Sequence, residues 1–183
     1  MKHFTITLLV LVLSCCSVFA QDKKPFWDKG YAGDVELGFL IKSYPYATIS
    51  TTHGYCFGKG WLIGLGGAFE SGLYARNMTD PQAEELPYEG DMMVKAFLDV
   101  RKSFELDKVN LYADLKFGTP FNLAHPLGFG YLVRPSVGVV LGNHWSISAG
   151  VDWSAYPYHA SYLSDDCPLK PITLPYLGVS YQF

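Results

Sequence analysis

Alternation between apolar and polar side chains is the dominant pattern along this chain. Residues 109–117 place Val, Leu, Ala, Leu and Phe on one face of an extended segment and Asn, Tyr, Asp and Lys on the other. Residues 145–153 divide in the same way, with a tryptophan at each end of the apolar face. A period of two residues is typical of a β-strand whose two faces meet different surroundings. Both segments are therefore predicted to be strands.

The same pattern predicts eight strands in all. The segment 47–57 is the least regular, because Ser50, Thr51 and Thr52 blur its two faces and His53 falls on the side of the apolar residues. A β-bulge in this segment is expected, and its faces stay unassigned. The predicted strands are residues 31–42, 47–57, 61–70, 94–101, 109–117, 129–139, 145–153 and 177–183.

Short and long links alternate between the predicted strands, with one short exception at residues 43–45. The tight turns are residues 58–60, 105–107 and 142–144, and the longer polar loops are residues 74–91, 119–127 and 155–170. Outer-membrane barrels have short periplasmic turns and longer outer loops. An even number of strands joined in this way predicts an all-β fold, an eight-stranded antiparallel up-and-down transmembrane β-barrel. Closure leaves no unpaired strand edge.

The polar faces carry both signs of charge together with many glycines. The interior of an eight-stranded barrel is just wide enough to be filled by side chains. We therefore expect the apolar faces to meet lipid and the charged residues to plug the lumen as an ionic network. That network is predicted to contain Asp34, Glu36, Lys95, Asp99, Arg101, Asp114, Lys116, Arg134 and Asp152. The alternative is that these residues form the solvated surface of a soluble barrel.

Aromatic residues gather near the ends of the predicted strands. One group is Tyr31, Phe57, Trp61, Phe104, Trp145 and Phe183, and the other is Tyr46, Phe69, Phe117, Phe129, Trp153 and Tyr156. Amphipathic rings favour the two interfacial layers of a membrane, which supports the lipid-facing interpretation.

The chain begins with a predicted signal peptide, residues 1–20, which precedes a barrel domain at 21–183. A basic start is followed by a short apolar run and by small residues before Gln21. The run is shorter than the roughly 20 residues that a spanning helix needs. A lipoprotein cleavage box ending in Cys15 is the competing interpretation. No disulfide is expected between the two later cysteines, Cys56 and Cys167, because the predicted topology places them at opposite ends of the barrel.

Charge and composition exclude some classes of partner. The formal net charge is −3, whereas a nucleic-acid-binding protein is expected to have a basic face. His53 and His144 lack a second ligand at metal spacing, so no metal site is expected. No phosphate-binding glycine loop is present, and no cofactor is expected.

The last strand carries a motif that points to a family. Tyr176, Gly178, Tyr181 and Phe183 resemble the terminal assembly signal of outer-membrane barrels, although one tyrosine stands where a plainer polar residue is usual. The region from residue 21 onward, including the glycine-rich stretch 62–68, is similar to small OmpX/OmpA-like porin-family barrels. The resemblance implies the outer membrane of a Gram-negative bacterium and contact with the barrel-assembly machinery. It implies no particular chemistry.

Activity is the least determined property. Some eight-stranded outer-membrane barrels modify lipid A, and the predicted outer loops contain His125, His159, Ser161, Ser164, Asp165 and Asp166. No motif surrounds these residues, so we expect no enzyme but a monomeric barrel with a membrane-structural or surface-interaction role. Its tyrosine-rich loops are expected to contact a surface partner or lipopolysaccharide. A soluble or lipid-anchored periplasmic ligand-binding barrel is the alternative.

Overall fold

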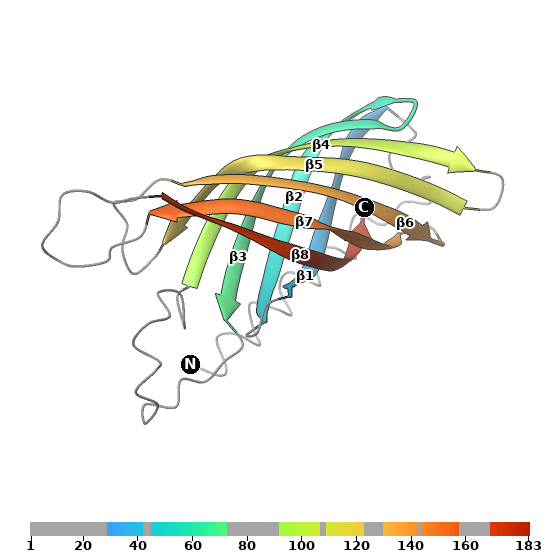
Figure 1. The fold of residues 1–183 in the computed structure, drawn as a ribbon. Helices are drawn as coiled ribbons and strands as arrows, with labels where there is room; N and C mark the ends of the chain where they lie inside the picture. The colour runs from blue at the N-terminus through green and yellow to red at the C-terminus, as the bar shows by residue number, and fades with distance from the viewer. Residues whose placement is uncertain are drawn as a thin grey trace, which may run out of the picture.

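The protein is a closed barrel in which each strand pairs with the next and the last pairs with the first (Figure 1). The computed structural model describes residues 29–41, 45–72, 92–106, 109–122, 130–142, 144–157 and 169–183. The strands are β1 (Gly30–Leu40), β2 (Tyr46–Gly58), β3 (Trp61–Gly72), β4 (Met92–Leu106), β5 (Val109–Asn122), β6 (Tyr131–Leu141), β7 (Trp145–Pro157) and β8 (Leu169–Gln182). Every pairing is antiparallel. The predicted all-β, eight-stranded barrel is confirmed.

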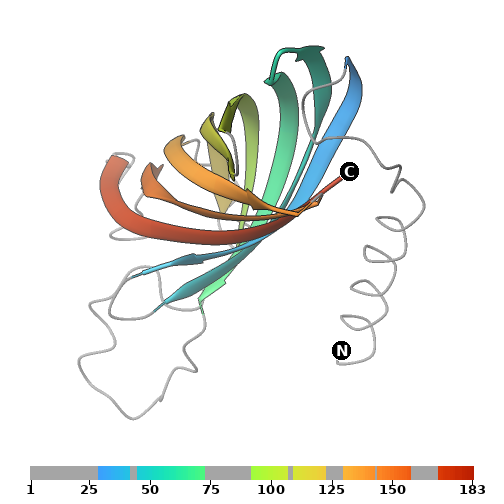
Figure 2. The same ribbon diagram turned by 90° about the vertical axis from the view of Figure 1, so that its right-hand side faces the viewer.

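The closing pair joins the two ends of the chain. Figure 2 shows β8 in red running toward β1 in blue, with the C-terminus beside that first strand. The register runs from Asp34 opposite Gln182 to Leu40 opposite Tyr176. Backbone hydrogen bonds between Gly33 and Phe183, each 2.9 Å long, extend the pairing to the last residue. In the described ranges, no helix has the length and apolar character needed to cross a membrane.

Several strands extend further than the sequence predicted, and the predicted loops are correspondingly shorter. Residues 119–122 belong to β5, 155–157 to β7, and 169–176 to β8. Pro120 lay within a predicted loop, yet it pairs with Lys95 in the β4–β5 ladder. Residues 171–176 were assigned to no predicted element, and Pro171 and Pro175 occupy paired positions in β8. The predicted turn at 105–107 is also wrong in part, because residues 105 and 106 pair within the β4–β5 ladder.

The bulge expected near His53 is absent from that position. The β2–β3 register is continuous from Tyr46 to Cys56 and shifts only beside the turn, between Cys56 and Gly58. His53 therefore keeps the outward direction that the alternation gives it, and it is exposed. The predicted tight turn is present, with positive φ angles of 86°, 53° and 77° at Gly58, Lys59 and Gly60.

The apolar faces point outward and the polar faces point inward around the barrel. Leu65 and Val137 are 69% and 63% exposed, whereas Lys95 and Asp99 are completely buried. This distribution is the reverse of that in a soluble protein, where large apolar side chains fill the core and charged ones cover the surface.

The aromatic residues near the strand ends follow the same rule with one correction. On the outer surface lie Tyr31, Phe57, Trp61, Phe104, Trp145, Phe69, Phe117 and Trp153. Tyr46 was expected to lie among the outer aromatics, but it is only 6% exposed and packs inside with Leu40 and Tyr176. The side chains of Phe129 and Tyr156 are outside the described part of the structure.

Candidate functional site: the ionic interior

The nine charged residues predicted for the interior all lie there, contributed by five strands. Each is at most 5% exposed. Asp34 and Glu36 come from β1, and the others follow from β4, β5, β6 and β7: Lys95, Asp99, Arg101, Asp114, Lys116, Arg134 and Asp152. They share the interior because each occupies an inward position of its strand.

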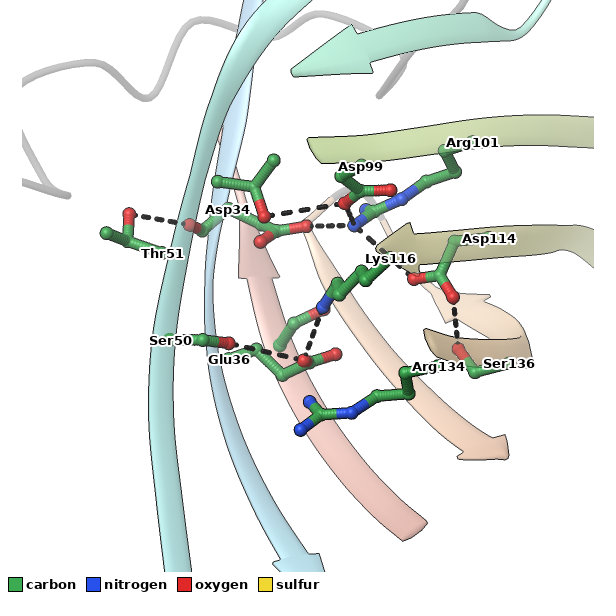
Figure 3. A network of polar contacts seen from close by, with 12 residues as sticks. Asp34, Glu36, Ser50, Thr51, Asp99, Arg101, Asp114, Lys116, Arg134 and Ser136 are labelled. Carbon is green, nitrogen blue, oxygen red and sulfur yellow. Dashed lines mark hydrogen bonds and ion pairs between the residues drawn. The ribbon is translucent and has the colours of Figure 1, made fainter. Parts of the chain in front are cut away.

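Arg101 is the centre of the first group of ion pairs (Figure 3). Its Nη2 atom lies 2.6 Å from Asp34 Oδ2, 2.9 Å from Asp99 Oδ2 and 3.7 Å from Asp114 Oδ2. Its guanidinium also stands over the ring of Tyr112, 5.0 Å from the centroid. One cation thus links β4 to β1 and β5.

Lys116 and Glu36 form the second group. The Lys116 Nζ atom lies 2.6 Å from Glu36 Oε1, which joins β5 to β1 across the interior (Figure 3). The Ser50 hydroxyl donates a hydrogen bond to the same carboxylate oxygen at 3.3 Å. The Lys116 ammonium also lies 5.4 Å from the centroid of the Phe97 ring.

Asp152 is the centre of the third group. It accepts hydrogen bonds from Arg134 Nη2 at 2.7 Å and from Lys95 Nζ at 3.2 Å. Lys95 also lies 2.7 Å from Glu70 Oε2, a buried carboxylate of β3. The Arg134 guanidinium stacks over the Tyr176 ring at 4.3 Å, which brings β8 into the group.

Glu70 is the member of the network that the sequence analysis missed. Glu70 shares a face with Gly64, Gly66 and Ala68 in the alternation of residues 61–70, but it was not included among the predicted ionic residues. The signal that could have identified it is the same alternation that identified the other residues. Its presence gives Lys95 two carboxylate partners, Glu70 and Asp152.

Among the described residues, the network pairs four buried cations with six buried carboxylates from distant strands. Burying an isolated charge is costly, and removing one partner of a buried pair leaves that cost uncompensated. The buried cations are Lys95, Arg101, Lys116 and Arg134, and the buried carboxylates are Asp34, Glu36, Glu70, Asp99, Asp114 and Asp152. The arrangement is therefore suited to holding the barrel closed.

Hydroxyl groups of the interior contact carboxylates, as Ser136 donates to Asp114 and Ser154 to Asp152. The two described histidines contact residues at the chain's C-terminal end, because His53 packs against the Phe183 ring and the His144 Nδ1 atom lies 2.9 Å from the Gln182 carbonyl oxygen. The described residues contain no cluster of His, Cys, Asp or Glu suited to a metal ion.

The terminal motif divides between the two faces of β8. Tyr176 and Gly178 are buried inside, whereas Tyr181 and Phe183 lie on the outer side. The Phe183 ring packs against Tyr31 and His53, at centroid distances of 6.5 and 6.0 Å.

Some predicted features lie outside the described residues. They are the signal peptide at 1–20, Cys15 and Cys167, and the loop residues considered for catalysis, His125, His159, Ser161, Ser164, Asp165 and Asp166. Cys56 is described, and it is buried beside Ala32 and Leu62.

No family model matches the chain, and no curated protein matches it. The barrel and the distribution of its side chains are therefore the features that point to a function.

Proposed function

We propose that the protein is a small outer-membrane barrel of the OmpX/OmpA-like kind, with a plugged lumen and a membrane-structural or surface-interaction role. The observation that carries this proposal is the apolar outer face. Large exposed apolar residues occur on every strand, among them Phe39, Leu65, Val137 and Val179. A surface of this extent needs an apolar solvent, because monomeric soluble proteins rarely expose contiguous apolar patches beyond a few hundred Å².

The buried network supports the plugged lumen. Its ion pairs cross the interior, as Lys116 to Glu36 does between β5 and β1. Large rings occupy further interior space at Tyr112, Tyr176 and Phe97, each at most 4% exposed. An eight-stranded barrel filled in this way leaves little room for a continuous water path. A structural role fits this interior better than solute transport.

Location and partners follow from the same proposal. The barrel is exported by its signal peptide, folded by the barrel-assembly machinery through the terminal motif, and held as a monomer among outer-membrane lipids. Its short turns face the periplasm and its longer loops face outward, where they contact lipopolysaccharide or a surface ligand. The family resemblance of the terminal motif and the alternation of link lengths support this orientation.

Membrane fractionation of a Gram-negative host that expresses the full chain tests the proposal. We expect the protein in the outer-membrane fraction after a urea wash, with migration in detergent gels that changes on heating. Recovery from the soluble periplasm would contradict the proposal and favour the ligand-binding alternative. A comparison of lipid A mass spectra with and without the gene tests the enzymatic alternative, and we expect identical spectra.

A further inference from the structure

We propose that a basic patch on the outer surface beside the β2–β3 turn binds the phosphate of an anionic glycerophospholipid. The patch consists of Lys59, Trp61, Lys102 and Phe104. The inference rests on the proposed function, because it assigns a lipid partner to the outer face of the barrel at the end where the chain's short turns lie. It adds a specific headgroup site to a surface otherwise suited only to acyl chains.

Lys102 is placed at this position by the β4 strand. It alternates with buried Arg101 and Ser103, so its side chain leaves the barrel on the outer face. The register sets Lys102 directly opposite Trp61 of β3. Its ammonium lies 5.0 Å from the Trp61 ring centroid and 5.9 Å from that of Phe104. Contact with two aromatic rings holds the cation near the outer surface instead of leaving it free in water.

The β2–β3 turn adds a second positive charge. The Lys102 ammonium donates a hydrogen bond of 2.5 Å to the backbone carbonyl of Lys59, which fixes the end of the Lys102 chain at the turn. Lys59 itself is exposed and has the positive φ of a tight-turn residue. An ammonium has three N–H donors, so Lys102 retains donors for a further acceptor beside a second lysine.

Neither lysine forms an ion pair with a carboxylate within the described residues. The nearest carboxylates of β4 in the sequence are Asp99 and Glu105, each three residues from Lys102, and strand alternation gives both the opposite direction from Lys102. Lys59 and Lys102 bring two positive charges to one turn, and both charges attract an anion bound beside the turn. The charge of the patch therefore favours an anionic ligand.

The surroundings identify the anion as a lipid headgroup. Exposed Phe57 and Trp61 lie at the same end of the barrel, and the apolar outer face continues along β3 through Ile63 and Leu65. A phosphate bound to the lysines would leave the attached acyl chains to lie along this apolar surface. Aromatic and basic residues combine in this way at membrane interfaces.

Fluorescence quenching by brominated lipids measures this binding directly. The full barrel would carry a single tryptophan, Trp61, after Trp27→Phe, Trp145→Phe and Trp153→Phe, and would be folded into phosphatidylcholine vesicles. Brominated phosphatidylglycerol and brominated phosphatidylcholine are then compared at equal mole fractions. We expect a relative binding constant at Trp61 that favours phosphatidylglycerol by about three- to tenfold. The ratio of the two binding constants should fall to about one in K59Q/K102Q and should persist in K102R. Lys29→Gln, at the same end of the barrel, should leave the ratio unchanged.

The possible results separate the inference from the proposed function. Equal quenching by both lipids in the parent, or a full preference retained in K59Q/K102Q, would overturn the headgroup site. Absence of quenching by either lipid would instead show that the barrel does not enter the bilayer, and both proposals would fail. Heat-modifiable migration of each variant shows that it is folded. Lys59→Gln provides a milder second variant, because it leaves the aromatic contacts of Lys102 in place. We expect this variant to show an intermediate preference for phosphatidylglycerol.

Discussion

The ring of Tyr176 lies over Gly38, across the seam where β8 closes the barrel on β1. A Cβ atom added at Gly38 would meet the ring and hydroxyl group of Tyr176 and the methyl group of Thr48. Tyr176 also stacks on the Arg134 guanidinium, so the ring connects the closing seam to the ionic network. The absence of a side chain at Gly38 thus provides the space that the Tyr176 ring fills.

Gly38→Ala is expected to destabilise the folded barrel by about 1–3 kcal/mol, because the added methyl group must displace a packed ring. Urea unfolding in lipid vesicles, followed by loss of the heat-modifiable form, measures this change. Gly67→Ala is the matched control, because Gly67 lies on the outer face and an added Cβ would meet only the Lys95 carbonyl oxygen, at 3.7 Å. Equal effects of the two substitutions would refute the packing argument.

Arg101→Met is expected to cost about 3–5 kcal/mol of unfolding free energy, because it leaves three buried carboxylates without their shared cation. The same urea titration provides the measurement. Lys29→Met, which removes an exposed lysine, should leave the unfolding midpoint nearly unchanged. Adding Asp34→Asn and Asp99→Asn to the Arg101 variant should recover part of the loss. A variant with Arg101→Met alone that is as stable as the parent would show that the ion pairs contribute nothing to closure.

Deletion of Phe183 is expected to lower the yield of folded barrel. The change removes the paired hydrogen bonds to Gly33 and the ring contacts to Tyr31 and His53, which together extend the closing seam. The measurement is the folded fraction in cells and in refolding from urea. Leu141→Ala, which shortens an exposed apolar residue on β6, is the control with little expected effect. A normal folded fraction after the deletion would show that the seam does not depend on the terminal residue.

The number and order of the strands, and the faces of all but the second, could be predicted because alternation depends on the surroundings of each face and not on any single residue. Even His53, which blurred the pattern, keeps the direction that a period of two assigns to it. The same periodicity predicted the interior positions of the nine charged residues. It carried no information on which cation meets which carboxylate, because Arg101 and Asp34 are brought together only by closure of the barrel.

Strand ends and interior aromatic residues were predicted less well. The last strand was predicted to begin only at residue 177, but the β7–β8 ladder already includes Pro171 and Pro175 as paired positions. Tyr46 was assigned to the outer aromatics because it stands at a strand end, and its inward direction follows from its parity with Thr48 and Ser50. The odd or even position of a residue in its strand therefore predicted the direction of its side chain better than its closeness to the strand end.

We propose that the apolar outer face meets acyl chains, and nitroxide accessibility measures this contact. Spin labels on cysteines at Leu65 and Val137, with Cys56 and Cys167 replaced by serine, would be compared with a label at Lys59 in the turn, using the full chain in native outer-membrane preparations. We expect the labels at positions 65 and 137 to collide with dissolved oxygen more often than with a water-soluble nickel chelate, and the label at position 59 to show the reverse. Preferential collision of all three labels with the nickel chelate would contradict this proposal.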